Sequence, residues 1–376
     1  MMTRYETIPP VSDESVRMDL WLWLIPLILS GLGIIMVTST TSSFVYDVSG
    51  SPFTMGIRQI RSLVFGFIMM LLTICIPTRF WRGIAAFMWA VSVTMLVATL
   101  IPGIGSSVGG AHRWLRIAGV SIQPSEIVML AVVLEMGKLF EKHSEDQSRC
   151  FRAVLILIAI TALPLLKQPD LGSIILLALV CMGMFVERYG WKLPLATGAI
   201  GILLLLLLVK FEPYRMRRLN AFLDPHADSL DSGFQTIQGL IAFANGSIWG
   251  AGLGHGFQKL QYLPAAYTDF IYAALGEELG LIGTLGLLTL MAMWLTRCRS
   301  LYKHAPGSYE TSIVWGITLT ILVPFFINVA GVTNLMPLSG MPLPFVSYGG
   351  SSLVMLWVRI GILLRIQRDI ARLNAS

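Results

Sequence analysis

Ten long apolar stretches, each long enough to cross a bilayer as a helix, recur along this chain of 376 residues. Of its residues 55% are hydrophobic and only 13% are charged, which is not the balance of a water-soluble domain. A spanning helix needs about 20 mostly apolar residues, and somewhat fewer where other helices surround it. The predicted spans are 20–39, 62–77, 84–102, 122–140, 151–167, 171–187, 193–211, 270–296, 311–330 and 350–366. We therefore expect an all-α polytopic membrane protein.

Lysine and arginine are concentrated in alternate loops between these stretches. With both termini inside, sixteen of them fall in cytoplasmic segments and five in short outer loops, which agrees with the positive-inside rule. This topology gives cytoplasmic tails over 1–19 and 367–376 around a single membrane domain over 20–366. The segment 212–269 is then a large outer loop. The net charge of +6 follows from the same bias, and no nucleic acid partner is expected.

The polar segments rich in glycine and proline all face outward in this topology, so function is expected on the outer side. The loop 212–269 is too long for a mere connector. Apolar residues within 234–244 recur at helical spacing, which favours an interfacial or re-entrant helix, or equally one that covers the tops of the spans. The glycines at 250, 252, 254 and 256 do not form a dinucleotide-binding loop, because His255 interrupts that pattern. A flexible outer loop is the remaining interpretation.

Asp269 stands where this outer loop meets the eighth span. A carboxylate at such a border is costly and calls for a reason. Together with Thr268 it occupies the position of a helix N-cap, whose side chain would satisfy free amides. A carboxylate there can also accept a proton from a substrate hydroxyl at the membrane surface. The two roles are compatible, and both stay open on sequence grounds.

Other charged residues lie at membrane depth, where they usually line a cavity or form pairs. Glu126 follows Gln123-Pro124-Ser125 and is expected to face a cavity. Glu277 is expected two turns below Asp269, lining the same cavity. The alternative for Glu277 is an interhelical pair with Arg359.

Two groups of arginines stand in outer segments near the membrane. One group contains Arg215 and Arg218, and the other contains Arg113. Guanidinium groups match phosphate oxygens with two parallel hydrogen bonds, so a pyrophosphate-bearing lipid is a natural ligand. Binding to ordinary anionic headgroups is the competing interpretation.

The four cysteines offer no pair in an outer loop, so neither a disulfide nor a zinc site is expected. Three of them lie at predicted cytoplasmic helix ends, and Cys181 lies inside a span.

Five segments together resemble a known family, the SEDS proteins of shape, elongation, division and sporulation, which includes FtsW, RodA and SpoVE. They are GAHRW with IQPSE (110–114 and 122–126), QPDLG (168–172), EPYRMRR (212–218), the stretch 250–280, and PLPFVSYGGSS (342–352). The residues at 252–254, 258–259 and 262–264 resemble the division branch more than the elongation branch.

The resemblance implies a peptidoglycan glycosyltransferase that polymerises lipid II at the outer face of the bacterial cytoplasmic membrane. It implies a class B penicillin-binding protein as partner, with other membrane proteins of the division or elongation machinery, and a divalent cation, Mg or Mn, as the one cofactor to expect. It places the catalytic carboxylate on Asp269. Substrate contacts are expected from Arg113, Glu126, Arg215, Arg218, Gln238, Lys259, Glu277, Ser347 and Tyr348. A lipid II flippase and a non-catalytic scaffold for the transpeptidase are the alternative functions.

Several positions depart from the family's usual pattern. Ala265 and Tyr267 stand where glutamate and histidine are usual near the aspartate. Met129 and Ser339 replace lysines, and Arg359 places a charge in the last helix at a usually uncharged position. These departures bear on rate, pH dependence or partner dependence rather than on the fold.

Overall fold

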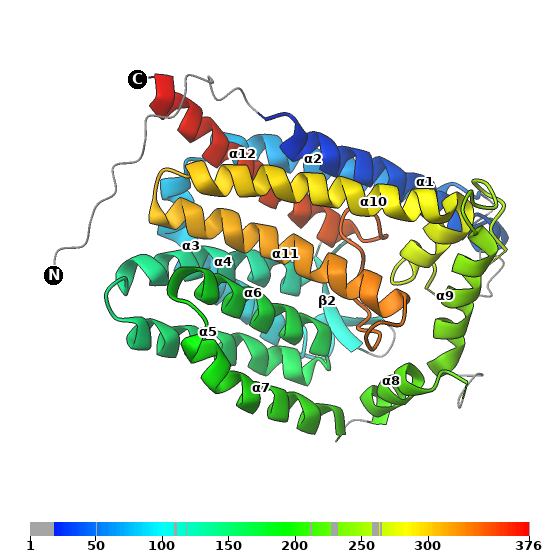
Figure 1. Cartoon of the computed structure of the whole chain (residues 1–376), viewed down its shortest axis with the longest axis horizontal. Coiled ribbons are helices and arrows are strands. Elements are labelled where there is room, and N and C mark those ends of the chain that lie inside the picture. The colour runs from blue at the N-terminus through cyan, green and yellow to red at the C-terminus, as the bar shows by residue number, and fades with distance from the viewer. Residues whose placement is uncertain are drawn as a thin grey trace.

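The computed structural model describes residues 19–49, 51–108, 111–117, 119–210, 213–226, 232–257, 263 and 265–375. A helix lies at each of the ten predicted spans, and these helices run side by side as a bundle (Figure 1). They are α1 (Trp21–Ser49), α2 (Thr54–Cys75), α3 (Thr78–Ala98), α4 (Pro124–Lys142), α5 (Gln147–Lys167), α6 (Leu171–Tyr189), α7 (Lys192–Lys210), α10 (Ile271–His304), α11 (Ser308–Val332) and α12 (Gly350–Ala375).

Eight of these helices are long and apolar enough to cross a membrane. The two others are α4, which carries charged residues along its length, and α7, whose described apolar part covers 192–204. The membrane class of the protein is thus confirmed, while the number of ten crossings and the orientation stay predictions. The last helix also continues beyond residue 366, where its span was expected to end, to Ala375.

A small antiparallel sheet interrupts the all-helical pattern between α3 and α4. Its strands β1 (Gly105–Val108), β2 (Ala111–Ile117) and β3 (Val120–Ile122) pair in the order β1-β2-β3. Gly119 makes the turn between β2 and β3 with a φ of 81°, which glycine adopts at little cost. Sequence analysis assigned this segment to an outer loop and did not predict the sheet.

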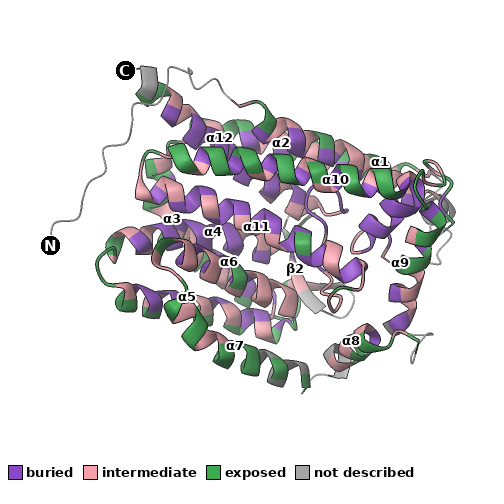
Figure 2. Cartoon of the chain, in the orientation of Figure 1, coloured by how far each residue is buried: buried purple, intermediate pink, exposed green. Residues whose placement is uncertain are grey.

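Small residues let neighbouring helices approach closely, as is usual where packing rather than water drives association. A Cβ on Gly66 of α2 would lie 3.1 Å from the Trp357 ring of α12. On the same pair of helices, a Cβ on Gly361 would lie 2.8 Å from the Met70 carbonyl oxygen. Buried positions accordingly gather on the central helices, whereas α7 is largely exposed (Figure 2).

The outer segment between α7 and α10 contains two further helices, α8 (Pro213–Leu223) and α9 (Ser232–Gly246). The predicted helix over 234–244 is therefore confirmed as part of α9. This helix packs against α8 and α10, which favours the covering interpretation. In Figure 1, α9 stands across the ends of the long helices.

The helix α10 folds back on itself at Gly280, whose φ of 66° and ψ of −162° are not helical. A Cβ on Gly276 would lie 3.4 Å from Cγ2 of Thr284, whereas residues eight apart in a straight helix are about 12 Å apart. The stretch is therefore a hairpin with a short arm (271–279) and a long arm (281–304). Only the long arm has the length of a span. Glu277 does lie two turns along the helix from Asp269, as predicted, because the reversal comes only at Gly280. The short arm runs back against the long arm, however, so Glu277 lies at the turn of the hairpin and not deeper along the span.

Candidate functional site

Three successive backbone carbonyls hold Asp269 and its two predecessors in place. The Tyr267 carbonyl accepts a hydrogen bond from the Tyr348 amide at 2.9 Å. The Thr268 carbonyl accepts one from the Ser347 hydroxyl. The Asp269 carbonyl accepts one from Nδ2 of Asn328 at 2.8 Å. The main chain at Asp269 is thus fixed by partners from the 341–349 loop and from α11.

The Asp269 side chain does not cap the helix that follows. Phe270 occupies the N-cap position of α10, with no side-chain hydrogen bond to the helix amides. The Thr268 hydroxyl donates to the carbonyl of Ala265 at 3.3 Å instead. The capping role was therefore wrong, and the carboxylate is left for another task.

Asp269 is a weaker acid than an ordinary aspartate. Burial raises its pKa from the usual 3.8 to about 6, because desolvation disfavours the charged form. The positive charges of Arg218 and Arg113 and the neighbouring Thr268 hydroxyl lower the pKa but do not cancel the effect of burial. A carboxylate with such a pKa is a stronger base than usual and is still largely ionised at neutral pH.

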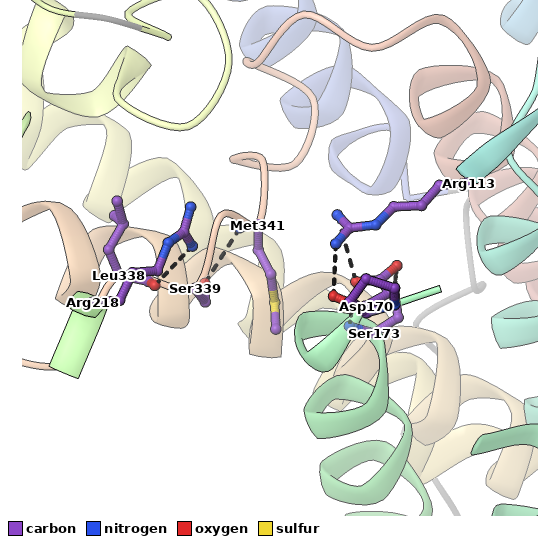
Figure 3. Close-up of polar contacts among 8 residues, drawn as sticks. Arg113, Asp170, Ser173, Arg218, Leu338, Ser339 and Met341 are labelled. Atoms are coloured by element: carbon purple, nitrogen blue, oxygen red, sulfur yellow. Dashed lines mark hydrogen bonds and ion pairs between the residues drawn. The ribbon is translucent and has the colours of Figure 1, made fainter. Parts of the chain in front are cut away.

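Arg113 reaches this site from β2. Its Nη2 donates to the Pro169 carbonyl at 2.9 Å, and its Nη1 lies 3.8 Å from Oδ1 of Asp170. Asp170 in turn caps α6, because its Oδ1 accepts from the Ser173 amide at 3.3 Å, and its Oδ2 accepts from the Ser173 hydroxyl at 2.8 Å (Figure 3). The sheet and the start of α6 are joined through this arginine, whose side chain remains partly exposed.

Arg218 reaches the site from α8 on another side. Its Nη1 donates to the Leu338 carbonyl at 3.0 Å (Figure 3). Two residues further on, a Cβ on Gly340 would lie 3.2 Å from Nη1 of Arg218 and 3.4 Å from Oδ2 of Asp269. The arginine and the carboxylate therefore flank the same point beside Gly340.

Replacing Gly340 by alanine is expected to lower activity by displacing one of these two groups. The position has a φ of 72°, so the substitution adds backbone strain as well as a contact. Gly103 is the matched control, because its φ is 88° but a Cβ there would meet nothing within 4 Å. Gly340→Ala should reduce product formation more strongly than Gly103→Ala in parallel rate assays. Equal losses would show that strain alone is responsible.

Ser347 and Tyr348 act on the main chain rather than on an open surface. Ser347 is buried, and its hydroxyl also accepts from the Leu343 amide at 2.8 Å. The Tyr348 ring packs edge-on against Tyr267, with ring centroids 6.0 Å apart. Tyr267 is one of the departures from the family pattern, and this contact is where its ring is accommodated. Ser347 is therefore described as a positioning residue, and the substrate contact expected from Tyr348 stays a prediction.

Sequence reasoning missed two residues that support this arrangement. Asn328 donates to both the Asp269 carbonyl and the Met341 carbonyl. Gln59 of α2 is fully buried and donates to the Ser347 carbonyl at 3.1 Å. For Asn328 the signal was a polar side chain inside a predicted span, because such groups are costly there unless they have partners. Gln59 lies just before the predicted span 62–77, so it gave no such signal.

Glu277 belongs to a different cluster, at the Gly280 end of the short arm. Its Oε1 accepts from the Phe257 amide at 3.0 Å and from Nδ2 of Asn245 at 3.3 Å. Glu278 accepts from the Gly254 amide at 3.1 Å and from the Ser39 hydroxyl. These buried carboxylates hold the glycine-rich loop onto α10, and the expected flexibility of this loop stays a prediction.

Glu126 is the partner of Arg359. One guanidinium nitrogen of Arg359, Nη2, lies 3.0 Å from Oε2 of Glu126 and 2.9 Å from its carbonyl oxygen. The arginine is only 3% exposed. A pairing of Arg359 with Glu277 was therefore wrong, and Glu126 is engaged in an ion pair between α4 and α12 rather than free to meet a substrate.

Three further predicted contacts are placed only in part. The backbone of Arg215 lies in α8, but its side chain is outside the described residues, and so is all of Lys259. Gln238 lies half-buried in α9, next to Gly239. A Cβ on Gly239 would lie 3.0 Å from the Phe270 ring, so α9 packs beside the residue that follows Asp269.

No group of three or more histidine, cysteine, aspartate or glutamate side chains suited to a metal ion occurs within the described residues. Among the described residues, the charges that act on the Asp269 carboxylate are those of Arg218 and Arg113. A divalent cation at this place would have to take most of its oxygen ligands from a phosphate-bearing substrate.

A family model described as a cell cycle protein, that of FtsW, RodA and SpoVE, matches residues 19–371. The match covers almost the whole chain, and the chain belongs to this family. Its apolar helices and this membership make it a multi-pass protein of the bacterial cytoplasmic membrane.

Relatives of similar length share about a third of the sequence. One from Geobacter sulfurreducens is 36% identical over 357 residues, which cover 94% of this chain and 96% of the relative. One from Coxiella burnetii is 33% identical over 365 residues, covering 94% and 97%. Both bear the name probable peptidoglycan glycosyltransferase FtsW. The predicted closer resemblance to the division branch agrees with these names.

Two solved structures share the fold. A chain from a study of polymerisation and crosslinking by a peptidoglycan synthase complex is similar with a TM-score of 0.78, 24% identity, and coverage of 94% of this chain and 98% of that one. The rod shape determining protein RodA of Thermus thermophilus is similar with a TM-score of 0.69, 23% identity, and coverage of 93% and 97%.

Proposed function

We propose that this chain is a peptidoglycan glycosyltransferase that joins lipid II units into glycan strands at the outer face of the membrane during septal wall synthesis. The observation that carries the proposal is Asp269, a single carboxylate with a raised pKa, fixed through its backbone and flanked by two arginines. The family membership and the names of the relatives support the same activity.

In this reaction a sugar hydroxyl attacks the anomeric carbon of a second lipid-linked sugar. Asp269 accepts the hydroxyl proton as the new glycosidic bond forms, and the bond from the anomeric carbon to pyrophosphate breaks. The leaving lipid pyrophosphate carries away the bonding electrons. It departs without an acid's assistance, because pyrophosphate is a far better leaving group than an alcohol.

Arg113 and Arg218 are suited to the charge of that leaving group. Each has a guanidinium anchored to a carbonyl, and the fork of donors on a guanidinium suits phosphate oxygens. Donors that are already in place stabilise charge without reorganising during the reaction. A Mg or Mn ion held between substrate phosphates would add to the same effect.

A class B penicillin-binding protein is the proposed partner, because it would crosslink the strands that this chain makes. A solved structure with the same fold comes from a peptidoglycan synthase complex. Other membrane proteins of the division machinery are expected to join the same assembly.

The test is reconstitution of the purified chain with its transpeptidase in bilayers, supplied with lipid II and Mg or Mn, and analysis of the products for glycan strands. Strand formation supports the proposal. Absence of product while the complex still forms favours the scaffold. Movement of lipid II across the bilayer without polymer favours the flippase.

The rate of polymerisation should depend on pH through Asp269. The base form is lost as pH falls through the pKa of about 6, so the rate should fall on the acid side of that value and level off above it. Because Arg218 lowers this pKa, Arg218→Gln should move the acid limb to higher pH. A pH-rate profile of both proteins checks the shift, and an unchanged limb would remove Asp269 as the titrating base.

A further inference from the structure

The loop at the turn of the α10 hairpin carries exposed apolar side chains. We call residues 247–257 the tip loop. Ile248, Trp249, Leu253 and Phe257 are 53%, 80%, 51% and 65% exposed. The tip loop contains no aspartate, glutamate, lysine or arginine. An exposed apolar patch of this kind marks a surface that contacts a membrane or another apolar partner.

The tip loop is fastened to the helix hairpin by its backbone. The Ala251 and Gly252 amides donate to the carbonyls of Glu277 and Glu278 at 2.9 and 3.0 Å. The Leu281 amide donates to the Ser247 carbonyl at 2.9 Å. The carboxylates of Glu277 and Glu278 accept from amides of the same loop. The tip loop and the hairpin therefore form one unit.

The apolar side chains of the tip loop continue the exposed face of the long arm. Leu281, Ile282 and Leu285 at the start of that arm are each about half exposed, as expected for positions that face lipid. The hydrogen bond from Leu281 to Ser247 places Ile248 and Trp249 directly beyond them. Exposed positions along α10 are seen in Figure 2.

The length of the long arm sets the depth of the tip loop. At its inner end Arg297 lies 3.9 Å from Asp19 in an ion pair, which marks the polar boundary. The helix from Leu281 to Arg297 covers about 24 Å, whereas the hydrocarbon layer is about 30 Å thick. The apolar layer therefore extends past Gly280, and the tip loop lies within its outer margin.

We propose that the tip loop is a membrane anchor, with Trp249, Phe257 and their apolar neighbours inserted in the outer leaflet. Tryptophan favours this boundary because its ring is apolar and its N–H finds polar partners. The short arm of the hairpin joins this anchor to Asp269. The depth of the anchor in the lipid therefore sets the position of the short arm at its Gly280 end.

The test places a nitroxide label at position 249 or 253 in bilayers and compares collisions with oxygen and with a water-soluble nickel chelate. Cys75 is first changed to serine, because it is the exposed member of the four free cysteines. Leu285→Cys gives the lipid-facing reference. His226→Cys, at an exposed position of the outer segment, gives the water-facing reference.

The expected result is that labels at Trp249→Cys and Leu253→Cys resemble the label at 285, with an oxygen-to-nickel collision ratio severalfold above that at 226. A ratio like that at 226 overturns the anchor. So does a label that is open to nickel in the isolated protein and becomes protected only when the transpeptidase is added, because the loop would then be a protein docking surface. Thermal unfolding of each labelled variant confirms that it is folded.

Discussion

Asp269→Asn is expected to lower the rate of glycan polymerisation by about 10²-fold or more, the range in which general base catalysis contributes. Asparagine has the same shape but cannot take the hydroxyl proton. The hydrogen bonds that fix this segment involve backbone carbonyls, so they survive the substitution. The measurement is the initial rate of strand formation by the reconstituted complex.

The stability of the Asp269→Asn protein should not fall along with its polymerisation rate. The folded-state pKa of Asp269 is above the ordinary value, which means that the ionised carboxylate is disfavoured by folding at neutral pH. A neutral asparagine should therefore leave the unfolding temperature unchanged or slightly higher. Asp224→Asn is the matched control, since it makes the same change at an exposed position after α8 and should keep the full rate. Full activity of Asp269→Asn would exclude the aspartate from the reaction.

Glu126→Gln is expected to destabilise the folded protein by about 3–5 kcal/mol, the usual cost of leaving a buried charge without its partner. The buried Arg359 guanidinium would lose the carboxylate that lies 3.0 Å away. Its Nε already has no hydrogen-bond partner, so little else can compensate. The measurement is the unfolding temperature in detergent or bilayers.

The control makes the same substitution in an exposed ion pair. Arg82 and Glu141 lie 2.8 Å apart, with side chains 53% and 25% exposed, and such pairs contribute about 0–1 kcal/mol. Glu141→Gln should therefore change the unfolding temperature little. The double variant Glu126→Gln with Arg359→Leu removes both charges and should be more stable than the single one. If Glu126→Gln and Glu141→Gln behaved alike, the pair would have no structural importance.

Sequence reasoning located the helices because hydropathy reports on each one locally. It did not detect the reversal at Gly280, although Glu277 and Glu278 interrupt the apolar pattern of 270–296 just before that residue. The positive φ of Gly280 is a property of the folded backbone. The sheet over 105–122 was not predicted because its strands are short and lie in a polar, glycine-rich part of the sequence.

At the site, the sequence identified Asp269, Arg113 and Arg218 through chemistry and resemblance. It could not assign partners across the chain. It offered Glu277 as a partner of Arg359, and only the packing of α12 against α4 shows that the partner is Glu126. Ser347 also looked like a substrate contact, because the direction of its hydroxyl cannot be read from the order of residues.

The three carbonyl contacts at 267–269 have a genetic consequence. The partners that provide them lie some 60 to 80 residues further along the chain, at Asn328, Ser347 and Tyr348. In a screen for loss of wall synthesis, substitutions at Asn328 and Ser347 should group with those at Asp269 while the protein still accumulates in the membrane. Second-site suppressors of such alleles should arise in the facing segment rather than next to the original change.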